Sequence, residues 1–333
     1  MPLCRGGNSL NYILLALFWS VRLLCKRGKG KGVYLGLVLL VIPLVNHIFF
    51  SDMDKDWTMV IRPQEKLWKL NLREIWAYRD LIELFVKRNI VVQYKQTILG
   101  PLWYLIQPIL TVIMNMVVFG GIAHMSTDGV PQALFYMAGN VCWFYFSDCL
   151  NQTSSTFVAN QGMFGKVYFP RMVVPISTVL SNLLRFAIQL GLFVAFYLYF
   201  FATGSDIHLT WAVLLLPILV VMIAGLGLGF GILISSMTTK YRDMTILFTF
   251  IVQLWMYVTP IVYPLSMVTH PMLRTLIMLN PMTSVIEVFK YATLGQGYFS
   301  WGALGYSFAF MCVLLLLGTV IFNKVQRSFM DTV

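Results

Sequence analysis

The sequence predicts an all-α integral membrane protein, with six transmembrane helices preceded by an amphipathic interfacial helix and a re-entrant helix pair before the last span. Three observations predict this fold. Hydrophobic residues make up 59% of the 333 residues and charged residues only 11%, and the mean hydropathy is +0.76. The apolar runs have the ~20-residue length that crosses a hydrocarbon core as a helix. Lys and Arg gather in alternate connecting segments, as the positive-inside rule requires.

The same composition excludes several classes of protein. A soluble domain carries roughly 25% charged residues, so the low charge excludes a soluble enzyme, a disordered chain and a nucleic-acid-binding module. The net charge of +11 then indicates cytoplasmic loop charge, and no nucleic-acid partner is expected. The five Cys and four His are scattered without CxxC or HExxH spacing, so we expect buried thiols and no metal site.

The six spans follow from the apolar runs, and their orientation follows from the charge between them. We place the spans at residues 101–122, 134–158, 173–201, 211–235, 246–263 and 303–322. Basic residues occupy segments 62–95, 159–172 and 236–245, whereas 123–133 and 202–210 contain no Lys or Arg. The alternation predicts a multi-pass protein with both termini on the cytoplasmic side.

The N-terminal extension 1–52 does not fit this orientation. Its apolar runs 10–25 and 33–50 are separated by a basic cluster from Lys26 to Lys31. If the second run spans the membrane, with or without the first, this cluster lies outside, against the positive-inside rule. Two expectations remain: either Met53 is the true start of the protein, or the extension lies on or re-enters the membrane.

Residues 53–98 are expected to form a cytoplasmic or interfacial segment whose main element is an amphipathic helix at 72–90. At 100° per residue its apolar and charged side chains separate onto two halves. The apolar half holds Ile75, Tyr78, Ile82, Phe85 and Val86, and the charged half holds Arg73, Asp80, Glu83 and Lys87. We expect the helix to lie in the membrane interface with its apolar face in lipid. The alternative is a solvated helix of a small cytosolic domain.

Five short motifs follow one another along residues 65–333. They are Arg79-Asp80-Leu81 with Tyr94 to Trp103, Lys166 to Arg171 with Pro175, Lys240 to Asp243, Asn280 to Thr283 with Glu287, and Ser328 to Asp331. In this order they resemble the motifs of the ABC type-2 permeases that export polysaccharides. The resemblance identifies 99–333 as an ABC type-2 transmembrane domain and leaves 1–52 without a counterpart.

The resemblance implies a half-transporter of the bacterial inner membrane. Two copies of the chain would form a homodimeric pore, and two copies of a separate ATPase chain would bind beneath it. ATP and Mg would be held by that partner, with no cofactor on this chain. The residues agree independently, because the sequence has no GxxxxGK[ST] phosphate loop. We therefore expect a transporter subunit and not an enzyme.

The inner segments are predicted to couple this chain to the ATPase. Segment 160–171 follows the second span and is expected to form a short coupling helix whose aromatic rings dock in a groove of the ATPase. The coupling residues are Phe164, Lys166, Tyr168, Phe169, Arg171, Lys240, Arg242 and Asp243. The alternative is that these are loops whose charges only fix the topology.

Polar residues in the second and third spans are the predicted substrate pathway. They are Asn140, Trp143, Tyr145, Asp148, Asn151 and Arg185. Polar groups are costly in hydrocarbon, so they face a partner helix or an aqueous path. Amides and aromatic rings suit sugars, but hydrogen bonding between helices is the alternative. Asp148 either binds sugar hydroxyls or pairs with Arg185.

Two further patterns have structural interpretations. Gly225, Gly227, Gly229 and Gly231 predict close helix packing and not a nucleotide fingerprint, because they lie inside an apolar span. The outer segment 264–302 is apolar but broken by Pro and Gly, which predicts the re-entrant pair. The resemblance implies that this pair gates the outer exit, with Asn280, Pro281 and Glu287 as its residues, and Glu287 then lies near the exit or pairs with Lys290.

The leading hypothesis is therefore export of a lipid-linked, O-antigen-like polysaccharide across the inner membrane. Capsule polymer and teichoic acid are the close alternatives. An ion-coupled secondary carrier is less favoured, because inverted repeats and several intramembrane carboxylates are missing from the sequence. A membrane glycosyl- or acyltransferase is also not favoured, because it needs a metal or phosphate site. The His residues are not clustered, and DxD spacing occurs only in the short polar run from Asp52 to Asp56, ahead of the predicted spans.

Overall fold

The computed structural model describes residues 72–95, 99–164, 167, 169–239, 241 and 243–330. The extension 1–52 lies outside the described residues, and so do Met53, the expected true start, and the segment between Met53 and the amphipathic helix. So do four predicted coupling residues, which are Lys166, Tyr168, Lys240 and Arg242.

Every regular element among the described residues is helical, as predicted. The elements are α3 (Leu72–Ala77), α4 (Arg79–Tyr94), η1 (Gly100–Leu102), α5 (Trp103–Asn115), η2 (Met116–Ile122), α6 (Gln132–Ser154), α7 (Thr156–Ala159), α8 (Gln161–Phe164), α9 (Val173–Ala202), η3 (Trp211–Leu215), α10 (Leu216–Thr238), α11 (Met244–Val258), η4 (Leu265–Met267), α12 (Pro271–Leu279), α13 (Pro281–Leu294) and α14 (Trp301–Met330). Each predicted span coincides with a helix, within a few residues at most ends.

Four stretches of these helices are long and apolar enough to cross a membrane. They are Trp103–Ile122, Val173–Ala202, Trp211–Thr238 and Trp301–Gln326. A fifth is added if α12 and α13, which are bent by 93° at Asn280, count as one broken span. Helix α11 is apolar but shorter, and α6 is the most polar of the long helices.

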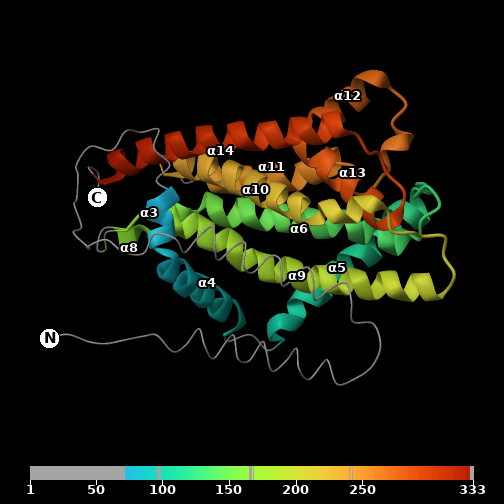
Figure 1. Cartoon of the computed structure of the whole chain (residues 1–333), viewed down its shortest axis with the longest axis horizontal. Helices are drawn as coiled ribbons and strands as arrows, with labels where there is room; N and C mark the ends of the chain where they lie inside the picture. The colour runs from blue at the N-terminus through green and yellow to red at the C-terminus, as the bar shows by residue number, and fades with distance from the viewer. Residues whose placement is uncertain are drawn as a thin grey trace. The chain divides into compact units, whose positions relative to one another are not determined.

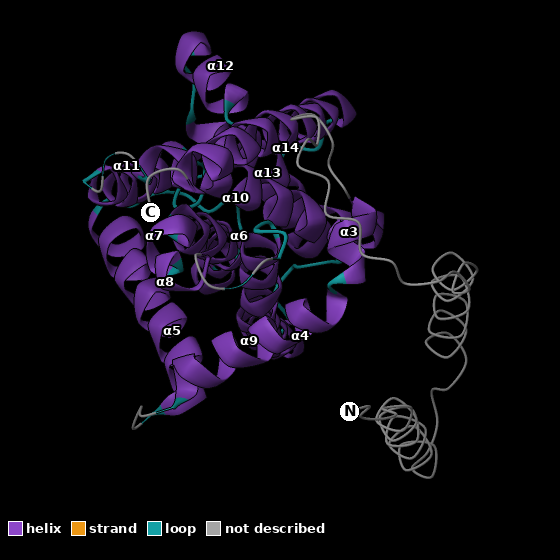
Figure 2. Ribbon diagram, turned by 90° about the vertical axis from the view of Figure 1, so that its left-hand side faces the viewer, coloured by secondary structure: helices purple, strands orange, loops and turns teal. Residues whose placement is uncertain are grey.

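Helix α6 forms the centre of the bundle, with α9, α10 and α13 packed around it (Figure 1). Most of its side chains are buried, including Tyr136 and Phe146. Viewed from the end, α5 lies to one side of the bundle, where it contacts α6 and α9 (Figure 2). Few side chains of α5 are buried, so most of its surface is open to lipid or to another chain.

The glycines of α10 confirm the prediction of close helix packing. Helix α10 lies between α6 and α14, and alternate glycines face the two neighbours. A Cβ at Gly227 would lie 2.7 Å from Cβ of Cys149 in α6, and one at Gly229 would lie 2.9 Å from Leu314 in α14. The absence of side chains at these positions lets three helices approach closely.

The amphipathic helix forms, but its apolar face is not in lipid, which corrects our expectation. Helices α3 and α4 replace the single helix at 72–90, with a turn at Tyr78. Phe85 is buried with Phe164 and Phe169 in a second cluster, which we call the small core, and Ile75 and Ile82 pack against it. Helix α4 also contacts α9. The apolar half was identified correctly, but protein covers it.

The bend between α12 and α13 follows from local chemistry. Asn280 caps α13, because its side-chain oxygen accepts a 3.1 Å hydrogen bond from the backbone N–H of Met282. Pro281 occupies the first helical position, where a missing N–H costs nothing. At the other end, Gly295 ends α13 in the left-handed conformation, with φ of 74°.

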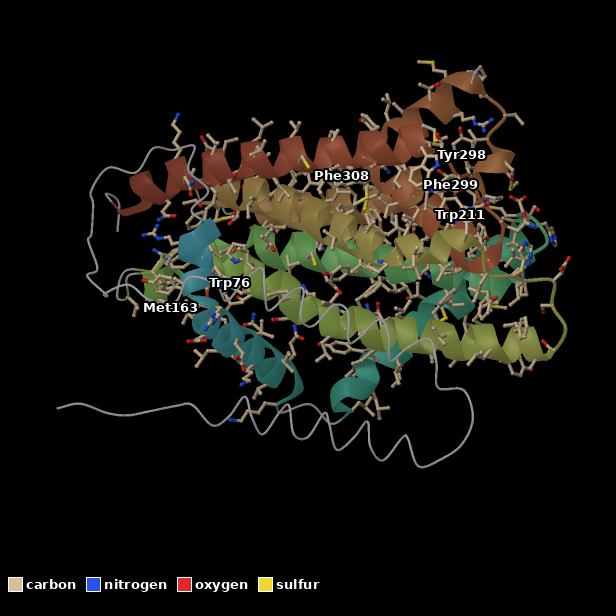
Figure 3. All side chains as sticks on the ribbon, in the orientation of Figure 1. Trp76, Met163, Trp211, Tyr298, Phe299 and Phe308 are labelled. Carbon is tan, nitrogen blue, oxygen red and sulfur yellow. The ribbon has the colours of Figure 1, made fainter. Side chains whose placement is uncertain are left out.

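Aromatic rings collect at the end of the bundle that carries α12 and α13, which we call the α12 end. Trp211, Tyr298 and Phe299 lie there, whereas Trp76 and Met163 lie at the opposite end, the α4 end (Figure 3). The ring of Phe299 lies 5.2 Å from Trp211 and 5.1 Å from Trp301. Tryptophan-rich clusters of this kind are typical of a membrane–water interface.

Candidate functional site

A polar face on α6 is the main candidate for contact with a hydrophilic solute. At the α4 end of the bundle, six side chains in α6 and directly after it are neither buried nor fully exposed. They recur at intervals of one, three or four residues, which puts them on one face of the helix. They are Phe144, Ser147, Asp148, Asn151, Gln152 and Ser155. Five of these six are polar, so the partly open side of the central helix is hydrophilic although its surroundings are apolar.

Asp148 and Arg185 are joined by an ion pair at this face. Nη1 of Arg185 lies 2.7 Å from Oδ2 of Asp148, and the two side chains are 16% and 23% exposed. Nη2 of Arg185 donates a 2.7 Å hydrogen bond to the side-chain oxygen of Gln107 in α5. One guanidinium therefore links α9 to both α5 and α6. The structure brings together the two residues whose pairing the sequence left open.

The same network reaches the α4 end through Tyr104. The guanidinium of Arg185 lies 4.9 Å from the centre of the Tyr104 ring, and the Tyr104 hydroxyl donates a hydrogen bond to Gln93 in α4. Asn89, also in α4, donates a 3.3 Å hydrogen bond to Ser181 in α9. Sequence reasoning missed Gln107, although a lone glutamine in an apolar span is the signal that could have found it.

Three predicted pathway residues do not reach the surface of this chain. Asn140, Trp143 and Tyr145 are 0%, 3% and 3% exposed. The Trp143 ring packs 5.3 Å from Phe146, and the Tyr145 ring packs 5.0 Å from Phe186. Asn151, by contrast, lies on the polar face and donates a 3.2 Å hydrogen bond to Ser147. The six predicted residues therefore divide into three core residues and three at or beside the open face.

Two of the three predicted coupling rings, those of Phe164 and Phe169, are buried in this chain, which corrects the expectation that they dock in a partner. Phe164 and Phe169 are 3% and 6% exposed, and their ring centres are 5.9 Å apart in the small core. Among the described residues of this turn, the exposed apolar side chain is instead that of Val167, at 58%. Asp243 is exposed just before α11. A partner binding here would contact Val167, not the phenylalanines.

Arg171 also points into the protein. It is 5% exposed, its Nη1 donates a 3.1 Å hydrogen bond to the carbonyl of Gln326 in α14, and its guanidinium lies 5.2 Å from the Phe164 ring centre. Burial lowers the pKa of Arg171 from its ordinary value. The guanidinium still keeps its charge at neutral pH, because arginine is not deprotonated in proteins. Arg171 therefore ties the turn before α9 to α14.

The three predicted exit-gate residues play two different parts. Asn280 and Pro281 are buried at the bend, where Asn280 donates a 2.9 Å hydrogen bond to Thr259 beyond α11 and the carbonyl of Pro281 accepts one of 2.8 Å from Ser307 in α14. Glu287 lies further along α13, 3.8 Å from Lys290. The pairing of Glu287 with Lys290, one of the two alternatives that the sequence left open, is therefore present in the structure.

Glu287 and Lys290 also line a cavity of about 210 Å³ at the α12 end. Its other polar side chains were not predicted, and they come from the loop before α6, from η4, from α12 and from the loop after α13. They are Asp128, Ser266, Arg274, Gln296 and Tyr298. These residues lie far apart in sequence and gave no common signal, so only folding could reveal this set.

A polar face inside a bundle of apolar, membrane-length helices defines a membrane transport protein. Among the residues that the structure describes, no group of three or more His, Cys, Asp or Glu could hold a metal ion. Residues 80–294 match the ABC-2 type transporter family. Because this match covers more than half of the chain, the protein belongs to that family.

Several curated relatives are similar over most of the chain. The O-antigen export system permease protein RfbA of Myxococcus xanthus is 28% identical over 66% of this chain and 82% of its own length. RfbA of Klebsiella pneumoniae is 26% identical over 76% of this chain and 94% of its own. The polysialic acid transport protein KpsM of Escherichia coli is 24% identical over 75% of this chain and 95% of its own.

Proposed function

We propose that this protein is the permease subunit of an ATP-driven exporter that moves a lipid-linked, O-antigen-like polysaccharide out of the cytoplasm. The observation that carries the proposal is the polar face of α6. At this face Arg185 pairs with Asp148 and donates a hydrogen bond to Gln107. Hydroxyl-rich polymers need such a surface, because a purely apolar bundle offers their hydroxyls no hydrogen-bond partners. The O-antigen relatives support the choice of substrate.

The proposed assembly has two copies of this chain and two copies of a separate ATPase, which holds ATP and Mg. The pore then lies between the two copies, which explains why α5 and α11 leave most of their apolar surface uncovered. The proposed topology has six spans, namely α5 with η2, α6, α9, α10, α11 and α14, with α12 and α13 as a re-entrant pair. The α4 end faces the cytoplasm of a bacterial inner membrane, with both termini on that side.

A capsule polymer is the second candidate substrate, because KpsM is named for polysialic acid. Teichoic acid remains a third within the same class. All three are polymers carried on a lipid, and the polar face of α6 does not discriminate between their sugars. An exporter of any of them needs the ATPase partner, whereas an ion-coupled carrier would move its solute without one.

The test is export by cells that lack their own permease and carry this chain together with an ABC ATPase subunit of a polysaccharide exporter. We expect surface polysaccharide in these cells, and little of it when the polar face is changed by Asn151→Leu together with Gln152→Leu. The matched control is Asn140→Leu, because Asn140 is fully buried and its amide has no hydrogen-bond partner in the described residues. Export that persists without the ATPase, or that is equal in both variants, contradicts the proposal.

A further inference from the structure

The cavity at the α12 end has the chemistry of a site for a neutral, hydroxyl-bearing ring. Its rim consists of exposed Asp128, Ser266, Arg274 and Tyr298, and its floor includes buried Glu287 and Lys290. Two carboxylates and two cations line the same space, so their charges cancel. A free anion or a free cation gains no net attraction there, whereas a polyol finds both acceptors and donors.

Buried Glu287 lacks one hydrogen bond in this cavity. Its Oε2 accepts a 3.1 Å hydrogen bond from the backbone N–H of Tyr298, but its Oε1 has no hydrogen-bond partner among the described residues. Lys290 is 3.8 Å away and instead donates a 2.6 Å hydrogen bond to the carbonyl of Pro260. A buried acceptor without a donor is unfavourable, so a hydroxyl group entering the cavity supplies what is missing.

The rim adds further acceptors and an aromatic surface. Both carboxylate oxygens of Asp128 lie 2.9 Å from the hydroxyl of Ser266, which can donate only one proton, so Asp128 keeps free acceptor capacity. Arg274 forms no ion pair among the described residues and lies 5.9 Å from the ring centre of Tyr298. Guanidinium and carboxylate groups beside a phenol ring suit the hydroxyl edge and the C–H face of a sugar.

We propose that this cavity binds one sugar residue of the exported polymer as it leaves on the outer side. This inference rests on the proposed function, which supplies both the identity of the polymer and the outer side of the membrane. The volume of the cavity, about 210 Å³, limits the ligand to a single ring and excludes an extended chain. The site would hold the polymer beside the bend between α12 and α13 and thereby oppose its slipping back.

The test is direct sugar binding to the full chain with its ATPase in nanodiscs, measured by saturation-transfer NMR. The probes are the free monosaccharides galactose, mannose, rhamnose and N-acetylglucosamine, with inorganic phosphate as the anionic probe. We expect signals from at least one sugar, reduced about fivefold or more by Asp128→Asn and by Glu287→Gln, which each remove a charged hydrogen-bond acceptor. Asp206→Asn, in another exposed loop, should leave them unchanged.

Thermal unfolding shows whether each variant is folded. If the buried change Glu287→Gln prevents folding, Asp128→Asn and Arg274→Gln, both on the exposed rim, decide the result. Sugar signals that are absent, or equal in all folded variants, overturn the proposal, and so does binding of phosphate in place of sugar. If the unaltered chain exports polysaccharide but binds no sugar, only the proposed sugar site is refuted. If the unaltered chain does not export polysaccharide at all, the proposed function is refuted.

Discussion

Lys290 donates a 2.6 Å hydrogen bond to the backbone carbonyl of Pro260, two residues beyond the end of α11. A second bond of 2.9 Å, from Asn280 to Thr259, joins the same segments. Helix α13 therefore holds the end of α11 at two points. This attachment matters because Val252 is the one side chain buried along the described length of α11. These polar contacts fix the end of α11, and the Trp255 ring, 5.4 Å from Phe146 and 5.1 Å from Phe230, packs the helix against α6 and α10.

Replacing Lys290 with methionine should destabilise the protein by about 3–5 kcal/mol, because it leaves the buried carboxylate of Glu287 without its cation. Adding Glu287→Gln to Lys290→Met should recover more than half of this loss. The measurement is thermal unfolding in nanodiscs. Lys87→Met is the control, since Lys87 is 72% exposed in its pair with Glu83 and its loss should not move the midpoint. If Lys290→Met alone is as stable as the unaltered chain, the prediction is contradicted.

The pair of Asp148 and Arg185 should behave as one unit in a double-mutant cycle. We expect Asp148→Asn or Arg185→Gln alone to cost about 1.5–3 kcal/mol, because each leaves a largely buried charge without its partner. The double variant should cost clearly less than the sum of the singles. Unfolding free energies provide the measurement, and additive losses would show that the pair is not coupled. Export by a stable double variant then reports whether either charge also contacts substrate.

Close packing of α6 on α10 should be sensitive to a single methyl group. A Cβ at Gly231 would lie 2.5 Å from Cβ of Thr153, so Gly231→Ala should destabilise by about 1–3 kcal/mol through overpacking. Gly191 in α9 has no atom within 4 Å of the corresponding position. Gly191→Ala should therefore be neutral or stabilising by about 0.5–1 kcal/mol. The measurement is the unfolding midpoint of each variant. Equal shifts for Gly231→Ala and Gly191→Ala would contradict close packing at Gly231.

At the α4 end, Val167 and Phe169 should respond differently to the same change. Val167→Asp should leave the fold intact, because the side chain is 58% exposed, but should weaken co-purification with the ATPase and lower its activity. Phe169→Asp should instead reduce the amount of folded protein, because it puts a carboxylate into the small core.

Leu209→Asp is the control for Val167→Asp. Leu209 is 60% exposed but lies in the loop between α9 and η3, away from the α4 end. It should leave binding of the ATPase unchanged. Equal binding by the Val167 and Leu209 variants would remove Val167 from the proposed coupling surface.

The length and apolarity of its segments are enough to determine the helices of this protein. A run of about 20 apolar residues has few alternatives to a helix in lipid, because every backbone polar group must be satisfied internally. The same reasoning identified the small residues of α10, the polar character of α6 and the charges of α13. It also offered the pairs of Asp148 with Arg185 and of Glu287 with Lys290 as alternatives, since an intramembrane charge needs a partner.

Only the tertiary structure decided which side of each element faces protein. Phe85, Phe164 and Phe169 were expected to contact lipid or a partner, yet they are buried together. Asn140 and Asn151 lie on one helix and look alike in sequence, yet one is in the core and the other at the open face. The physical reason is that lipid and protein interior are equally apolar, so hydropathy cannot tell them apart. Which polar residues meet, as at the α12 end, depends on how distant loops are brought together.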